Sequence, residues 1–290
     1  MEATTTQDET KTRKDVFGVI SEKITGQLMQ GNVPWQKPWS QQPTNLITKK
    51  PYRGINVILL GMEEYEHNFF LSFDQVHGIG GKVKKGSKGH PVMYWRKAND
   101  GTDGQKNGSY DYYTVFNIAQ CENIPESYLS VVSETPAHPS PEYIIASMPN
   151  CPKIQHKELR AYYEVVDDIV HMPKKGNIKK TTEYYAMLFR QLVHSTGHDS
   201  RLGRAGLVEM HELSNDATFS KEDLVADIGV CFLMSITGLP IKFQNGPGYV
   251  PGWLGKFKGN KRLISIAAGE AQKAVDYILN SFGKEEVGDE

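Results

Sequence analysis

Two consecutive amphipathic segments, residues 181–198 and 221–239, constrain the fold of this chain most strongly. In both segments apolar side chains recur at helical spacing, which predicts two helices. Gly197 supplies a C-terminal stop for the first helix, and Ser220 is placed as the N-cap of the second. We therefore expect two well-bounded helices that follow one another along the chain.

Each predicted helix carries a pair of side chains that can bind a metal ion. His194 and His198 are four residues apart on the first, and Asp223 and Asp227 are four residues apart on the second. Residues four apart share a helix face, and imidazoles on one helix that face carboxylates on another are the elements of a hydrolytic zinc site. The candidate metal ligands are therefore His194 and Asp223, with His198 and Asp227 as alternatives. An ordinary pair of surface or core histidines is the competing interpretation.

Residues 189–202 read FRQLVHSTGHDSRL, and this stretch resembles the pattern F-H-E-L-x-H-x-T-G-H-x-S-R-L of the ArdC-type antirestriction family. Two fixed positions of that pattern differ. Arg190 stands where the first zinc-binding histidine belongs, and Gln191 stands where the general-base glutamate belongs. A guanidinium has no lone pair for a metal, and a carboxamide cannot take a proton from a bound water. We therefore expect no catalytic residues at these two positions.

The resemblance implies an α+β fold with two domains. The N-terminal domain would bind single-stranded DNA, and the C-terminal domain would be a zincin-like domain of the gluzincin type. The altered motif predicts an inactive peptidase with no metal or with zinc at low occupancy, and it predicts that Asp227 contacts Arg190 in place of the missing histidine. Two alternatives stay open. One is an active zinc metallopeptidase coupled to DNA binding, with a base such as Glu222, and the other is a pseudopeptidase that binds a host protein or peptide in its cleft.

The charge distribution points to a polyanion as the partner of the N-terminal half. The chain of 290 residues has a formal net charge of −1, but residues 10–98 hold 14 basic and 6 acidic residues, a net charge of +8. Residues 99–150 hold 1 basic and 7 acidic residues, a net charge of −6. A basic block in an otherwise neutral chain is a candidate footprint for nucleic acid, although solvated lysines are the common alternative.

The basic block also carries aromatic residues, as proteins that bind single strands without sequence preference do. A Gly- and Lys-rich stretch, residues 80–89, could bring ammonium groups and free backbone amides to phosphates. The tryptophans of the segment PWQKPW could stack on bases, or they could cap the core instead. The candidate DNA-binding residues are Trp35, Lys37, Trp39, Lys49, Lys50, Tyr52, Arg53, Lys82, Lys84, Lys85 and Lys88.

Local patterns predict further elements in the N-terminal half. Apolar spacing predicts helices over residues 14–30 and 73–79, and alternation predicts strands over residues 91–96 and 110–117. Periodicity does not decide between helix and strand for the apolar run 55–60. The expected organisation is a disordered tail (1–13), a DNA-binding domain (14–126), a linker (127–143), a zincin-like domain (144–282) and a second disordered tail (283–290).

Cysteine usage and hydropathy favour a cytoplasmic protein without a membrane segment. The three cysteines form no C-x-x-C pair, so neither a disulfide framework nor a zinc ribbon is indicated. No apolar run approaches the length that a bilayer requires. By resemblance, the expected role is to protect incoming plasmid or phage DNA from host restriction.

Overall fold

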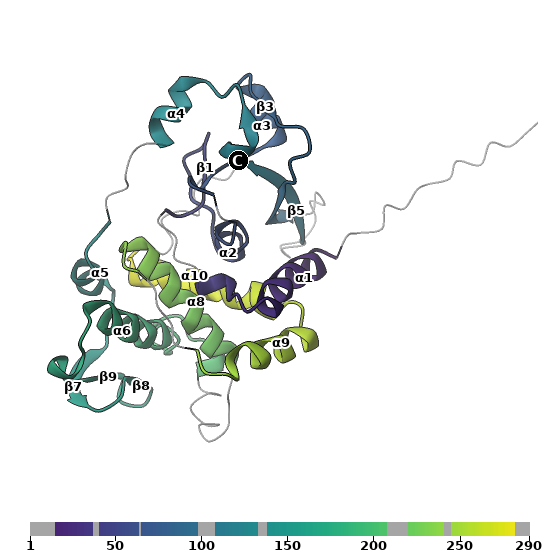
Figure 1. Cartoon of the computed structure of the whole chain (residues 1–290). Coiled ribbons are helices and arrows are strands. Elements are labelled where there is room, and N and C mark those ends of the chain that lie inside the picture. The colour runs from purple at the N-terminus through teal and green to yellow at the C-terminus, as the bar shows by residue number, and fades with distance from the viewer. Residues whose placement is uncertain are drawn as a thin grey trace, which may run out of the picture.

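The computed structural model confirms the expected α+β fold (Figure 1). It describes residues 15–36, 41–63, 65–97, 108–132, 138–207, 220–240 and 245–281. The two tails that the sequence predicts as disordered, 1–13 and 283–290, lie outside these residues.

The N-terminal half contains the helices predicted from apolar spacing. Asp15 caps the first of them through its carboxylate, which accepts a hydrogen bond from the backbone nitrogen of Gly18 at 3.0 Å. The apolar run that periodicity left undecided is helical. The helical elements are α1 (Val16–Met29), the 3₁₀ turn η1 (Pro34–Gln36), α2 (Ile55–Gly61), α3 (Phe73–Gly78), the 3₁₀ turn η2 (Ile118–Gln120) and α4 (Glu126–Val132).

A four-stranded sheet in the order β1-β2-β5-β4 forms the centre of this half. Strands β4 and β5 pair antiparallel over eight residues of β4, so the predicted hairpin is confirmed. A two-stranded ribbon, β3 with β6, lies beside α3 (Figure 1). The strands are β1 (Thr44–Asn45), β2 (Phe69–Ser72), β3 (Lys82–Val83), β4 (His90–Lys97), β5 (Gly108–Asn117) and β6 (Cys121–Glu122).

The C-terminal half is a helical layer with a small sheet at one side. Strand β9 lies between β7, with which it is parallel, and β8, with which it is antiparallel. The elements are α5 (Pro141–Ser147), β7 (Lys153–Glu158), β8 (Tyr162–Glu164), β9 (Ile169–Pro173), the 3₁₀ turn η3 (Lys175–Asn177), α6 (Thr181–Ser195), α8 (Lys221–Ile236), α9 (Tyr249–Gly259) and α10 (Leu263–Ile278).

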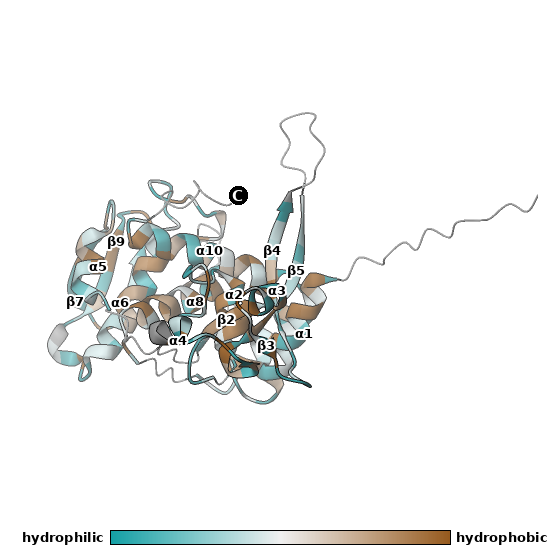
Figure 2. Cartoon of the chain, turned by 90° about the horizontal axis from the view of Figure 1, so that it is seen from above, coloured by the Kyte–Doolittle hydropathy of each residue, from teal (hydrophilic) through white to brown (hydrophobic). Residues whose placement is uncertain are grey.

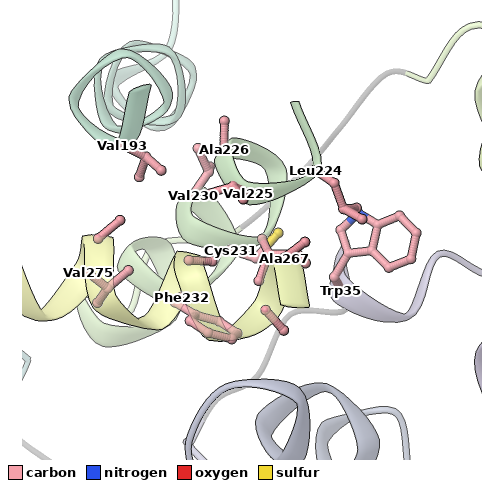
Figure 3. Packing of buried hydrophobic residues seen from close by; sticks show 14 of the residues in the cluster. Trp35, Val193, Leu224, Val225, Ala226, Val230, Cys231, Phe232, Ala267 and Val275 are labelled. Carbon is pink, nitrogen blue, oxygen red and sulfur yellow. The ribbon is translucent and has the colours of Figure 1, made fainter. Parts of the chain in front are cut away.

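The two halves of the sequence contribute side chains to one hydrophobic core. Side chains from α1 and α2 belong to the same buried cluster as those of α6, α8 and α10. Figure 3 shows Trp35 beside Leu224 of α8. The Trp35 ring also packs edge-on against Trp253 of α9, with the two ring centroids 6.3 Å apart. The predicted linker includes all of α4 except its first residue, and it includes the first three residues of α5.

Hydropathy follows this packing, with apolar residues concentrated where α1, α2 and the C-terminal helices meet (Figure 2). Two smaller buried clusters lie around the N-terminal sheet. Within the described ranges, each helix is too short or too polar to cross a membrane.

Candidate functional site

The motif residues lie where α6 and α8 pack side by side. Gly229 of α8 allows the close approach, because a Cβ added there would be 2.8 Å from a methyl carbon of Val193. Helix α8 begins with a capping box, in which Ser220 accepts from the backbone of Asp223 and the Asp223 carboxylate accepts from the backbone of Ser220. Helix α6 therefore presents its last turns to the first turns of α8.

Arg190 occupies the space between these helices and binds both candidate carboxylates of α8. Its Nη1 donates to Oδ1 of Asp227, and its Nη2 donates to Oδ1 of Asp223 at 3.1 Å. Burial alone would lower the pKa of Arg190, but the charges of Asp227 and Asp223 outweigh burial and raise it. The expected contact between Arg190 and Asp227 is confirmed, and Asp223 joins it.

Asp227 has a second partner that extends the cluster to the N-terminal half. The Tyr249 hydroxyl donates to Oδ2 of Asp227 at 2.5 Å, and it accepts from Nε1 of Trp35 and Nε2 of Gln36, both at 3.2 Å. Burial and the adjacent Asp227 charge raise the pKa of the Tyr249 phenol well above its ordinary value. One network therefore joins η1, α6, α8 and α9, and we call Arg190, Asp223, Asp227 and Tyr249 the arginine cluster.

Glu222, in the first turn of α8, is held by Arg204. The Arg204 side chain donates twice, from Nη2 to Oε1 at 2.5 Å and from Nε to Oε2 at 3.1 Å. Nδ1 of the buried His194 is 3.6 Å from Oε1 of Glu222. Burial would raise the pKa of Glu222, but the neighbouring His194 and Arg204 lower it. Glu222 is therefore an ionised structural partner, which argues against its role as a recruited base.

His198 does not share a helix face with His194, contrary to the sequence prediction. Helix α6 ends at Ser195, and His198 lies in the following turn, where its Nδ1 is 2.8 Å from the Ser200 hydroxyl. Because the helix ends before His198, the spacing of four residues does not place the two imidazoles on one helix face.

The residues at the expected metal position do not fit a metal ion. The structure places Asp223 and Asp227 on a guanidinium and places His194 beside Glu222. In the part of the chain that the structure covers, no three His, Cys, Asp or Glu side chains converge as a metal site requires. Gln191, at the base position, is buried and offers no carboxylate.

Among the candidate DNA-binding residues, two aromatic side chains are buried. Trp35 is 0% exposed and Tyr52 is 8% exposed, so neither ring is available to stack on a base. The prediction was wrong for both, because these rings fill core space instead of lying on the surface. Lys37 and Trp39 lie outside the described residues.

The basic candidates lie at the surface. Lys84 and Arg53 contact other parts of the chain. Nζ of Lys84 donates a hydrogen bond to the Ala119 carbonyl at 2.9 Å, and Arg53 forms an ion pair with Asp276 of α10. The exposed basic candidates are Lys49, Lys50, Arg53, Lys82, Lys84, Lys85 and Lys88.

Comparison with known proteins identifies the architecture. Residues 14–117 match the family model described as the N-terminal domain of anti-restriction factor ArdC, and residues 143–270 match the model described as a zincin-like metallopeptidase. The crystal structure of the metal-free antirestriction ArdC protein from the R388 plasmid is 33% identical, with a TM-score of 0.75 over 92% of this chain and 97% of that one.

The chain belongs to the ArdC antirestriction family. The Mn(II)-bound structure of the same ArdC protein is 32% identical, with a TM-score of 0.74 over 94% of this chain and 100% of that one. An ArdC protein can therefore bind a metal ion. This ArdC-family chain has instead an arginine in the ligand position, and the described residues show no metal-binding group.

Curated relatives extend the family to longer proteins. A DNA primase TraC of Escherichia coli is 29% identical over 92% of this chain, which spans 27% of the relative's length. The protein y4eC of Sinorhizobium fredii (strain NBRC 101917 / NGR234) is 24% identical over 94% of both chains. The ArdC-type sequence therefore occurs both alone and as part of a larger protein.

The structure reveals exposed aromatic residues in this ArdC-family chain that the sequence interpretation did not include. They lie on the β4–β5 hairpin, where alternation along each strand sends the rings to both faces. The segments MYWRK and YDYYT carried the signal, because large aromatics at successive strand positions cannot all be buried on one side. The exposed rings are Tyr94, Trp95, Tyr110 and Tyr113.

Proposed function

We propose that this chain is a single-stranded DNA-binding antirestriction protein whose zincin-like domain serves as a scaffold without hydrolysing peptides. Its DNA would be plasmid or phage DNA that enters the cytoplasm. The match to the ArdC N-terminal domain and the exposed basic and aromatic side chains of the N-terminal half support DNA binding.

The observation that carries the second part of the proposal is the arginine cluster. A zincin uses two imidazoles and a carboxylate to hold its metal, and a glutamate to activate water. Here a guanidinium neutralises Asp223 and Asp227 from the first ligand position, and Gln191 lacks the basicity to accept a proton. Among the described residues, this site therefore offers neither the donor set nor the base that a zincin peptidase uses.

Fluorescence anisotropy with a labelled 15-mer of thymidine tests the DNA-binding part. Full-length protein should bind the oligonucleotide without sequence preference, more tightly than a duplex of equal length, with affinity that falls steeply with salt. The variant Lys84→Glu with Lys85→Glu should weaken binding, because both ammonium groups are exposed in the Gly- and Lys-rich stretch 80–89. The proposal is overturned if the full-length protein shows no measurable affinity for the oligonucleotide at low salt.

A casein assay tests the scaffold part. Purified protein should cleave neither casein nor itself in the presence of zinc. Cleavage that a chelator abolishes, and that is lost in His194→Ala, contradicts an inactive domain.

A further inference from the structure

A groove of about 1120 Å³ lies between the β4–β5 hairpin and the helices α1 and α10. In Figure 2 the hairpin projects from the body beside α1. Ligand pockets for single drug-sized molecules measure about 300–1,000 Å³. The groove therefore has room for more than one flat ring, and it brings together parts of the chain from both family-model regions.

The hairpin side of the groove is an aromatic wall. Trp95 and Tyr110 are each 46% exposed, and their ring centroids are 4.8 Å apart. Phe17 of α1 continues the wall, with its centroid 5.5 Å from that of Tyr110. Aromatic side chains usually lose most of their surface to a core, so adjacent half-exposed rings lining a concave surface indicate a contact site.

The position of Trp95 depends on a glycine across the hairpin. A Cβ added to Gly108 would be 2.6 Å from two carbon atoms of the Trp95 indole, a distance that real Cβ atoms do not show. The indole therefore lies directly over the backbone of Gly108, which pairs with Lys97 at the end of the ladder. Because Gly108 has no side chain, its backbone can contact the Trp95 indole and fix the position of this exposed ring.

The opposite side of the groove is basic. Residues 256–262 read KFKGNKR, and the stretch from 249 to 269 contains no acidic residue. The Arg262 guanidinium lies 4.9 Å from the centroid of Phe17, on the lining of the groove. Nζ of Lys261 is 3.5 Å from Asp15, which also lines the groove. Cations therefore border the aromatic wall.

Each of the two carboxylates of the groove offsets one neighbouring cation, and further cations lie beside these ion pairs. Asp15 is paired with Lys261, and Asp111 is paired with Arg96 at 3.2 Å. Both belong to the protein's own ion pairs, whereas the exposed Lys256 and Lys258 lie in the last turn of α9, just before the groove-lining Arg262. The arrangement of rings on one side and cations on the other matches a strand whose bases and phosphates point in different directions.

We propose that single-stranded DNA binds in this groove, with bases stacked on Trp95 and Tyr110 and phosphates facing Lys261 and Arg262. The inference rests on the proposed DNA-binding function and deepens it, because it makes the site composite. The ArdC N-terminal region provides the stacking wall, and the zincin-like region provides the phosphate contacts. Duplex DNA would bind weakly there, since its bases are already stacked and paired. A proline-rich peptide also suits aromatic grooves, but it carries no charge that would account for the basic side.

The test measures anisotropy of a labelled 15-mer of thymidine with full-length variants. Trp95→Ala and Tyr110→Ala should each weaken binding by about tenfold, and Trp95→Phe should retain most of the affinity because it keeps a ring for stacking. Tyr143→Ala removes a ring of α5 that is even more exposed, at 68%, and is the control. Ile266→Trp should block the groove from the α10 side without removing a contact, since Ile266 is exposed on its lining.

Charge reversal tests the basic side. Lys261→Glu with Arg262→Glu should weaken binding and flatten its salt dependence. Lys179→Glu with Lys180→Glu makes the same charge change at exposed positions just before and at the N-cap of α6, and it should leave affinity unchanged. Far-UV circular dichroism and thermal unfolding establish that each variant is folded.

The outcomes separate the inference from the function on which it rests. If the wild-type protein binds no oligonucleotide, DNA binding itself is wrong. If it binds, but Trp95→Ala, Ile266→Trp and the Lys261/Arg262 variant all bind as tightly as wild type, DNA lies elsewhere and the groove assignment is overturned. Binding of a proline-rich peptide that competes with the oligonucleotide, and that is stronger than the oligonucleotide, also overturns it.

Discussion

The guanidinium of Arg190 on α6 binds the carboxylate of Asp227 on α8, so an ion pair joins the two helices at the position where a zincin holds its metal. A metal ion joins helices by binding lone pairs from each of them. The arginine joins the helices in a different way, because its guanidinium donates hydrogen bonds to carboxylates and binds no metal. The stability of this region therefore depends on charge pairing within the chain.

Asp227→Ala should destabilise the protein by about 3 kcal/mol, because it removes the buried carboxylate that accepts hydrogen bonds from both Arg190 and Tyr249. Arg190 and Tyr249 both lose their acceptor, although Asp223 still binds Arg190. Urea unfolding monitored by circular dichroism measures the change. Asp223→Asn is the control: it should cost less, since its carboxylate is more exposed than that of Asp227. Equal stability of wild type and Asp227→Ala contradicts a structural role for the cluster.

Arg190→His combined with Gln191→Glu should increase zinc affinity, because it restores the H-E-x-x-H motif with His194 and frees Asp223. Isothermal titration calorimetry and elemental analysis measure binding. Gln191→Glu alone should gain no zinc, as the guanidinium still occupies the ligand position. Purified wild-type protein that carries one zinc ion per chain disagrees with this explanation.

Glu63 should stabilise the fold in a pH-dependent manner. Burial would raise its pKa, but the neighbouring His90 and Lys23 outweigh burial and lower it from 4.5 to about 2. A depressed pKa in the folded state gives stability that is present above the unfolded pKa and is lost as pH falls toward the folded pKa. The contribution, roughly 2 kcal/mol, should therefore disappear between about pH 4.5 and pH 2.

The variant Glu63→Gln isolates this effect from the other acids of the chain. It should be less stable than wild type at pH 7 and should approach wild-type stability near pH 2. Unfolding free energies of both proteins across this range give the difference, and a difference that does not vary with pH refutes the linkage.

Trp35→Ala should destabilise the whole chain by about 3–5 kcal/mol, because a fully buried ring leaves a large cavity. Its indole packs against Trp253 and Phe257 and donates to Tyr249, so the loss should affect the C-terminal helices as well. Hydrogen exchange in α9 measures this transmission. Trp95→Ala should leave stability nearly unchanged, since that ring is half exposed, and unchanged exchange in α9 of Trp35→Ala contradicts a shared core.

The sequence by itself determined the elements of the site region. Apolar periodicity and capping residues predicted α6 and α8, because these signals act within a few residues of one another. The family motif located Arg190, Gln191 and Asp227, and chemistry alone showed that a guanidinium pairs with carboxylates instead of binding a metal. From the family motif together with this chemistry, the contact between Arg190 and Asp227 followed without coordinates.

Tertiary structure decided what lies between distant segments. Trp35 looked equally suited to a surface or a core, and only its packing against α8 and α9, more than 180 residues away, assigned it to the core. The same holds for the groove, whose aromatic wall comes from Trp95 and whose basic side comes from Arg262. Periodicity along the chain reports which face of an element is apolar, but it does not report which distant element covers that face. The fold alone brings these side chains together, because burial depends on every segment that packs around a residue.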